Sequence, residues 1–303
     1  MKLSVIIPTH NRVDLLSRAI KSVQDQTISD IEIIVVSDGS TDGTDELMKS
    51  LSEKDERIRY YYYSPAKGGN YARNWGIQKS TADFVVFLDD DDVWLPTKLE
   101  EQLAVVNSSE SIGLVYTGIN AIYVNEGVTY SSLPSKTGDL SKEILLSNYI
   151  GSTSTVLIRK SVFEKAGVFD EELKALQDYD LWIRIAQVTE IGAVKKELVD
   201  YYNYRGGKGQ VSSVTSKYEE AFQHINKKYE TLLANLSPEQ RVQKLVFEKF
   251  LLGNKAMRNN DPRTARSYFR SIMDVKFNLK ALIYYFLTFT NFKTVLKFRT
   301  LKK

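Results

Sequence analysis

The 303-residue chain contains no cysteine, only two histidines, and no long apolar run. The lack of cysteine excludes disulfide bonds, zinc–thiolate sites and thiol catalysis, and it is typical of proteins in a reducing cytoplasm. A bilayer-spanning helix needs about 18 or more consecutive apolar residues, and no segment reaches that length. Residues 1–8 are too short in their apolar part for a signal peptide. We therefore expect a cytoplasmic location.

Charge is distributed unevenly along the chain. Residues 276–303 carry seven Lys or Arg and no Asp or Glu, so the formal total of +3 leaves the remainder net negative. A general basic surface for nucleic acid is therefore not expected. A basic segment rich in aromatic and aliphatic residues suits peripheral contact with an anionic membrane. Two alternatives for this segment are a helix packed on the rest of the chain and a subunit interface that makes a homo-oligomer.

In the first hundred residues, short apolar segments alternate with segments of helical pattern. This βαβα order predicts an α/β fold with a mostly parallel central sheet flanked by helices. We expect strands at 3–7, 31–36, 58–63 and 84–88, and helices at 13–26, 44–52 and 69–79. Farther on we expect a helix at 98–107, strands at 112–116, 119–124 and 154–158, and a helical C-terminal region at 218–303.

Four consecutive aspartates, Asp89 to Asp92, follow the apolar segment at 84–88. Adjacent carboxylates repel one another unless a cation or a donor-rich ligand compensates them. In an open α/β sheet, ligands bind at the carboxyl ends of the strands. An EF-hand beginning at Asp89 is excluded because Trp94 stands where that loop needs glycine. Magnesium or manganese shared with a diphosphate fits better, and the alternative is an acidic loop in which Asp92 or Thr97 caps the next helix.

Two further strand ends carry polar residues. The turn at residues 8–12, Pro-Thr-His-Asn-Arg, lacks the glycines of a dinucleotide fold or a P-loop. The second strand runs into residues 37–44, Ser-Asp-Gly-Ser-Thr-Asp-Gly-Thr, where tight turns and capping of the next helix explain most positions. Asp38 is left without such an explanation and is a candidate binding residue.

Taken in order, the motifs of this chain resemble the bacterial family 2 nucleotide-sugar glycosyltransferases, which are inverting enzymes of the GT-A fold. The resemblance covers roughly residues 3–215. It implies a GT-A catalytic domain at 1–217, with a nucleotide-binding half at about 1–96 and an acceptor-binding half at about 97–217. The segments that carry it are residues 8–12, 37–40, 69–77 (Gly-Asn-Tyr-Ala-Arg-Asn-Trp-Gly-Ile), 88–92 and 177–184 (Gln-Asp-Tyr-Asp-Leu-Trp-Ile-Arg).

The resemblance also implies roles for individual residues. Asp89 and Asp91, the two ends of an Asp-any-Asp motif, would hold Mn²⁺ or Mg²⁺, and Asp38 would read the uracil edge. Asp178 would be the general base, because an acceptor hydroxyl must lose its proton to a carboxylate during attack; capping of a helix is the alternative. The expected nucleotide-binding residues are Pro8, Thr9, Asn11, Arg12, Asp38, Arg73, Asp89 and Asp90. For Arg73 the alternative is a surface salt bridge.

Two departures from the family pattern stand out. Gln177 replaces the glutamate that usually precedes the base, and residues 204–210 lack the histidine that often completes the metal shell. Gln210 or water would then fill that position, or the metal would bind mainly with the nucleotide. The glycine-rich loop around Lys208 is either a segment that closes over the diphosphate or a plain solvent turn.

The sequence thus predicts a metal-dependent, inverting, hexosyltransferase-type enzyme. It would transfer a single sugar from a UDP-sugar to a hydroxyl of a saccharide, glycoprotein or lipid-linked acceptor, in cell-surface polysaccharide or glycoprotein synthesis. One alternative is a sugar nucleotidyltransferase, which needs a glycine-rich loop after the first strand. Another is a non-catalytic sugar-nucleotide or glycan-binding subunit, against which the joint presence of Asp89, Asp91 and Asp178 argues.

Overall fold

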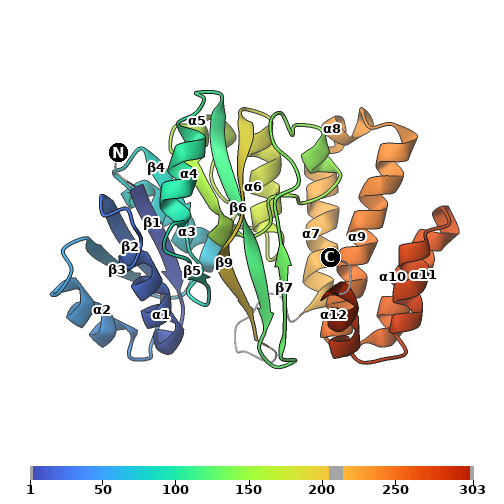
Figure 1. Ribbon diagram of the computed structural model, residues 1–303, viewed down its shortest axis with the longest axis horizontal. Helices are drawn as coiled ribbons and strands as arrows, with labels where there is room; N and C mark the ends of the chain where they lie inside the picture. The colour runs from blue at the N-terminus through green and yellow to red at the C-terminus, as the bar shows by residue number, and fades with distance from the viewer. Residues whose placement is uncertain (1–2, 205–213, 301–303) are drawn as a thin grey trace.

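The computed structural model describes residues 3–204 and 214–300 of the chain. Its strands are β1 (Leu3–Thr9), β2 (Ile31–Asp38), β3 (Ile58–Tyr63), β4 (Phe84–Phe87), β5 (Val93–Trp94), β6 (Ile112–Tyr123), β7 (Val128–Ser132), β8 (Val156–Arg159) and β9 (Glu190–Asn203). They form one sheet in the order β3-β2-β1-β4-β8-β6-β9-β5, with β7 paired to β6 (Figure 1). The first four strands are parallel, and β8 runs antiparallel to both β4 and β6.

Helices surround this sheet and continue beyond it. They are α1 (Val13–Gln24), α2 (Thr44–Ser52), α3 (Gly69–Lys79), α4 (Lys98–Val106), α5 (Val162–Ala166), α6 (Gln177–Ala186), α7 (Thr215–Lys228), α8 (Glu230–Ala234), α9 (Pro238–Arg258), α10 (Pro262–Val275), α11 (Leu279–Leu287) and α12 (Phe292–Thr300), with short 3₁₀ helices η1 (Glu143–Leu145) and η2 (Thr153–Thr155). Ser237 and Asp261 each cap a helix that begins with proline, accepting a backbone N–H three residues on.

Successive residues of β1 face opposite sides of the sheet, as strand geometry requires. Val5 and Ile7 pack in the core beneath α1, whereas Ile6 belongs to the core on the other face. There α3 approaches the strand closely, because a Cβ on Gly76 would lie 2.4 Å from the Ile6 side chain. The parallel half of the sheet is therefore buried on both faces, which matches its continuous apolar segments.

The apolar core on the Ile6 side of the sheet runs on into the C-terminal helices. It includes Trp182 of α6, Phe250 of α9, Phe269 of α10 and Leu296 of α12. Figure 1 shows α7 and α9 standing beside the sheet, with α10 and α11 outermost. The predicted boundary at residue 217 falls inside α7. Among the described helices, none combines the length and the apolar character needed to cross a bilayer.

The predicted α/β fold is confirmed, with three differences in its elements. Residues 112–116 and 119–124 were expected as two strands, but β6 is one strand whose register with β9 shifts around Gly118. A Cβ at Gly118 would lie 2.7 Å from the Ser132 carbonyl oxygen, so glycine permits close strand packing here rather than ending the strand. Strands β5, β7 and β9 were not predicted; in β9 the pattern of buried residues does not alternate regularly. Residues 154–155 belong to η2, and β8 begins at Val156.

Candidate active site

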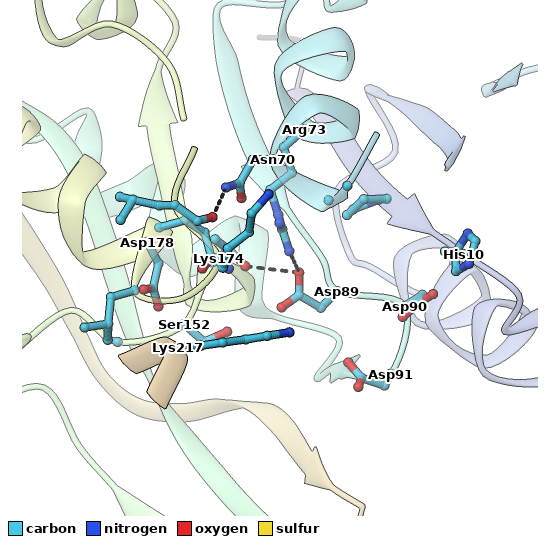
Figure 2. Close-up of a pocket in the computed structure, with 18 of the residues that line it drawn as sticks. His10, Asn70, Arg73, Asp89, Asp90, Asp91, Ser152, Lys174, Asp178 and Lys217 are labelled. Carbon is cyan, nitrogen blue, oxygen red and sulfur yellow. Dashed lines mark hydrogen bonds and ion pairs between the residues drawn. The ribbon is translucent and has the colours of Figure 1, made fainter. Parts of the chain in front are cut away.

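A cleft of about 650 Å³ opens where the carboxyl ends of β1, β2 and β4 meet the start of α6. Its lining includes nine of the sequence-predicted site residues: Pro8, Thr9, Arg12, Asp38, Arg73, Asp89, Asp90, Asp91 and Asp178. Asn11 does not line it. Instead, the Asn11 side-chain oxygen accepts a hydrogen bond from the Thr41 backbone N–H at 2.7 Å, joining the turns after β1 and β2. Figure 2 shows Asp89 and Asp178 facing the same space from opposite walls.

The first aspartate after β4 is held by the neighbouring helix. Arg73 of α3 donates a 2.5 Å hydrogen bond to the Asp89 carboxylate, and the Thr153 hydroxyl donates another at 3.1 Å. Arg73 itself is only 7% exposed. The alternative of a surface salt bridge for Arg73 does not apply, because its partner Asp89 lines the cleft and its guanidinium is buried. The two hydrogen bonds fix the direction in which the Asp89 carboxylate points.

The next two aspartates share one arginine. Arg12 donates to Asp90 at 2.8 Å and lies 3.3 Å from Asp91, while Thr9 donates to the other Asp90 oxygen at 2.8 Å. Burial and then the charges of Asp89 and Asp90 together raise the pKa of Asp91 to about 7, and Arg12 offsets only part of this rise. Burial disfavours the charged form of Arg12 and so lowers its pKa, but the charges of Asp90 and Asp91 outweigh this and leave the pKa raised. Asp91 is thus a carboxylate whose negative charge is poorly compensated by the protein.

The fourth aspartate turns away from the cleft. Asp92 is 0% exposed; it accepts hydrogen bonds from the Ser154 hydroxyl at 2.6 Å and the Tyr202 backbone N–H at 3.2 Å. Burial and then the charges of Asp91 and Asp89 raise its pKa well above the ordinary value. Asp92 therefore anchors the acidic loop to η2 and β9. Thr97 occupies the N-cap position of α4 without a side-chain capping bond, so helix capping does not account for the four aspartates.

Two of the carboxylates suit a divalent ion shared with a ligand. Within residues 3–204 and 214–300, no group of three or more Asp, Glu or His could hold a metal ion on its own. Magnesium and manganese take about six oxygen ligands and commonly bind through one or two carboxylates, water and substrate phosphates. The undercompensated carboxylate of Asp91, together with Asp89 across the same cleft, fits that arrangement. Gln210 and the loop around Lys208 lie outside the described residues.

At the end of β2, one carboxylate organises a loop. Asp38 is 6% exposed and accepts backbone hydrogen bonds from Lys67 at 2.6 Å and Gly68 at 2.9 Å. The following Gly39 has a φ of 66°, and a Cβ there would lie 2.9 Å from the Ala66 nitrogen. A carboxylate offers about four lone-pair sites, so Asp38 can accept a ligand N–H as well.

The opposite wall is formed by the start of α6. Leu176 precedes this helix with a φ of 56°, a left-handed conformation that is uncommon for a bulky residue and often found at functional sites. Asp178 accepts a hydrogen bond from the Tyr179 backbone N–H at 2.7 Å. Burial raises the pKa of Asp178 to about 6, the Tyr179 bond opposes this, and the charge of Asp89 adds to it. Its neighbour Asp180 is buried outside the cleft, 2.9 Å from both Arg184 and Lys228.

Several residues of the cleft could not be found by sequence analysis. They are Thr153, Lys174 and, from the C-terminal helices, Lys217, Tyr218, Leu251, Lys255 and Arg258. No motif marks any of them, because each reaches the cleft through tertiary packing. Figure 2 shows the Lys217 side chain extended into the cleft from α7. The C-terminal helices therefore supply one wall of the site.

Comparison with known proteins identifies the family. A sequence model described as glycosyl transferase family 2 matches residues 4–167. A glycosyltransferase of Haemophilus influenzae is 32% identical over 75% of this chain and 76% of its own length. A Campylobacter jejuni protein named GalNAc(5)-diNAcBac-PP-undecaprenol beta-1,3-glucosyltransferase is 34% identical over 61% of this chain. That match spans 59% of the Campylobacter protein, and matches to several Rickettsia relatives span between 28% and 59% of theirs.

Solved structures share the fold at low sequence identity. Staphylococcus aureus TarS, residues 1–349 in complex with UDP-GlcNAc, superposes with a TM-score of 0.60 at 17% identity, covering 90% of this chain and 91% of that one. The mannosyltransferase PcManGT from Pyrobaculum calidifontis, in complex with GDP-Man and Mn²⁺, gives 0.60 at 16% identity, covering 99% and 87%. This chain therefore has the GT-A fold and belongs to glycosyl transferase family 2.

Proposed function

We propose that this protein is a metal-dependent glycosyltransferase that transfers one sugar from a UDP-sugar to an acceptor hydroxyl with inversion at the anomeric carbon. The observation that carries the proposal is the placement of Asp38, the Asp89–Asp91 pair and Asp178 around one cleft. These carboxylates come from three separate segments of the chain. We assign Asp38 to recognition of the base, the Asp89–Asp91 pair to binding of the diphosphate, and Asp178 to acceptance of a proton.

The nucleotide would lie along the ends of β1, β2 and β4. Asp38 would accept the imide N–H of uracil, and the turn from Pro8 to Arg12 would border the ribose and diphosphate. A nucleobase with the wrong hydrogen-bonding pattern would leave the buried Asp38 carboxylate facing an acceptor, which is unfavourable. The TarS fragment solved with UDP-GlcNAc supports a UDP-linked donor.

The diphosphate end of the donor would meet Asp89 and Asp91. A divalent ion bound there would offset the negative charge that builds on the departing nucleotide. Arg73 and Thr153 orient the Asp89 carboxylate, and Arg12 partly balances Asp90 and Asp91. The PcManGT complex with Mn²⁺ supports the use of a divalent metal by a protein of this fold.

Asp178 would take the proton from the acceptor hydroxyl as it attacks. Its pKa of about 6 leaves it mostly ionised near neutral pH while keeping it a better base than an exposed aspartate. Only one carboxylate is assigned to the reacting centre, and attack by the acceptor itself inverts the anomeric configuration. The name of the Campylobacter relative supports a lipid-linked acceptor as one candidate.

One experiment distinguishes the proposed glycosyltransferase from the two alternatives, a sugar nucleotidyltransferase and a non-catalytic sugar-nucleotide or glycan-binding subunit. A screen of UDP-, GDP- and CDP-sugars, with and without Mn²⁺, would measure slow hydrolysis of the sugar–phosphate bond. We expect hydrolysis of a UDP-sugar that requires the metal. UDP should bind at least about tenfold more tightly than CDP, because cytosine presents an acceptor where uracil presents its imide N–H to Asp38. Pyrophosphate-dependent cleavage would instead indicate a nucleotidyltransferase. Binding of the nucleotide sugar without turnover by any acceptor would indicate a non-catalytic subunit, and equal affinities for the three nucleotides would contradict the role of Asp38.

A further inference from the structure

Basic side chains also line the cleft. Four of them are Lys174 in the loop before α6, Lys217 on α7, and Lys255 and Arg258 on α9. Of these four, Lys255 is the one whose charge acts on Asp178. In the described part of the chain, Lys174, Lys217 and Lys255 make no hydrogen bond and no ion pair with a carboxylate. A lysine that lines a binding cleft without an acidic partner is a natural receptor for a ligand anion.

Lys255 has the most constrained position of the group. Its ammonium lies 4.4 Å from the centre of the Tyr218 ring, and Arg258 follows one helical turn later on the same face of α9. Arg258 is held in turn by a 3.1 Å hydrogen bond to the Tyr204 carbonyl oxygen. Both cations are therefore fixed against the wall of the cleft rather than free to move in solvent.

Lys255 lies in a predominantly positive environment. Burial and then the charge of Arg258 lower its pKa to about 7; Asp178 opposes this shift, and Arg299 adds to it. Asp178 also influences the pKa of Tyr218, as does Arg258. Asp178 is thus the neighbouring carboxylate of Lys255, yet the two lie too far apart to form an ion pair. A bound anion would reduce the repulsion between Lys255 and the two arginines.

We propose that Lys255 and Arg258 form an anion subsite that binds a phosphate or carboxylate group of the acceptor. The inference rests on the proposed function, because the acceptor must present its hydroxyl to Asp178. The subsite adjoins Asp178 but lies on the C-terminal helices, away from the Asp89–Asp91 end where the donor diphosphate is assigned. An acceptor whose anionic group lies within a few bonds of the reacting hydroxyl would contact both. Its negative charge would be recognised by Lys255 and Arg258, and its hydroxyl would be directed toward the base.

Binding of small acceptor probes tests this subsite. Calorimetry would be done on the full chain with UDP and Mg²⁺ at saturation, so that the donor site cannot take a phosphate. The probes are glucose, glucose 6-phosphate and glucuronate, which differ in charge but share the sugar ring. We expect at least about tenfold tighter binding of one or both anionic sugars than of glucose. The comparison of glucose 6-phosphate with glucuronate distinguishes a phosphate from a carboxylate.

Matched variants identify the residue responsible. Lys255→Gln should remove the preference for the anionic sugars, and Lys255→Arg should retain most of it. Lys249→Gln is the control, because Lys249 lies on the same helix beside Tyr268 and outside the cleft. The affinity for UDP should be unchanged in all three variants. Lys255→Met provides a second neutral variant if the glutamine substitution does not fold.

The possible failures can be told apart. If the wild-type protein binds UDP but does not prefer the anionic sugars, or if Lys255→Gln keeps the preference, the anion subsite is wrong and the proposed function stands. Loss of UDP affinity in Lys255→Gln would assign the lysine to the donor and overturn the inference. If Lys255→Gln lowers turnover equally for charged and uncharged acceptors and shifts the pH profile, Lys255 positions or tunes Asp178 instead. Failure of the wild-type protein to bind any nucleotide would count against the proposed function itself.

Discussion

The two ends of the cleft differ in how far their charged side chains are paired within the protein. At the end formed by β1 and β4, carboxylates already have protein partners: Asp89 is held by Arg73, and Asp90 by Arg12 and Thr9. At the end formed by α6 and α9, Asp178 and Lys255 face the same space without forming an ion pair. At the first end, contacts within the protein hold Asp89 and Asp90 in a fixed frame, although Arg12 only partly balances Asp91. At the second end, Asp178 and Lys255 have no such ion pair, and we expect a substrate to contact them.

The largest effect should follow from removing the base at the unpaired end. Asp178→Asn keeps the shape of the side chain but cannot accept the acceptor proton, so turnover should fall by about 10² or more. The affinity for UDP should stay near normal, because Asp178 lies outside the donor end. Steady-state kinetics on the nucleotide sugar found in the screen, with calorimetry for UDP, measures both. Asp139→Asn, at an exposed position, is the control, and turnover of Asp178→Asn within a few fold of wild type would mean that another base acts.

The next largest effect should follow from removing Asp91, at the end of the cleft formed by β1 and β4. At Asp91, burial and the charges of Asp89 and Asp90 outweigh the contact with Arg12, so Asp91→Ala should remove the increase in UDP affinity that Mn²⁺ produces. The loss should be at least about tenfold, and binding of UDP without metal should change little. Calorimetry with and without Mn²⁺ measures the difference. Unchanged metal-dependent affinity in a folded Asp91→Ala protein would refute the assignment.

A smaller effect should appear in the dependence on pH. The Asp178 carboxylate has its pKa raised to about 6, and the base must be deprotonated to act. Activity should therefore rise about tenfold per pH unit below 6 and level off above it. A divalent ion beside Asp89 would shift this rise in activity to lower pH, because the charge of Asp89 is one cause of the raised pKa of Asp178. A profile of kcat/KM against pH at fixed Mn²⁺ tests the prediction. If the same rise with pH persists in Asp178→Asn, a group other than Asp178 causes it.

Sequence analysis predicted one end of the cleft better than the other, and the reason is physical. Asp38 and Asp89 follow parallel strands directly, so the order of strands alone brings them to one edge of the sheet. Lys255 and Arg258 reach the same cleft only because α9 packs against the core beside α6, and that packing depends on contacts between distant segments. Likewise, the sequence offered Asp92 only as a possible helix cap, but the loop turns its carboxylate into the interior, where the Ser154 hydroxyl and the Tyr202 backbone N–H donate to it. Local patterns predict strand ends well, whereas the faces of packed helices require the tertiary structure.

The smallest expected effect concerns the region farthest from the cleft. Helix α11 and the connections on either side of it expose apolar side chains at Phe277 (73%), Leu279 (61%), Phe286 (61%) and Phe289 (66%). Tyr284 instead contacts both Phe250 and Phe269, so the alternative of a helix packed on the rest of the chain describes one face of α11. Because residues 276–303 carry seven basic residues and no acidic one, we propose that the exposed face contacts an anionic lipid surface.

Replacing the four exposed residues tests this contact better than deleting the tail, because deletion would uncover Phe250 and Phe269. We expect the wild-type protein to co-sediment with liposomes containing phosphatidylglycerol but not with pure phosphatidylcholine. A variant with serine at positions 277, 279, 286 and 289 should bind the anionic liposomes at least about tenfold more weakly, since each large apolar side chain contributes roughly 1.5–3 kcal/mol when buried. Its hydrolysis of the nucleotide sugar should be unchanged. If the wild-type protein ignores both liposomes and the serine variant changes from dimer to monomer in light scattering, the exposed face is a subunit interface instead.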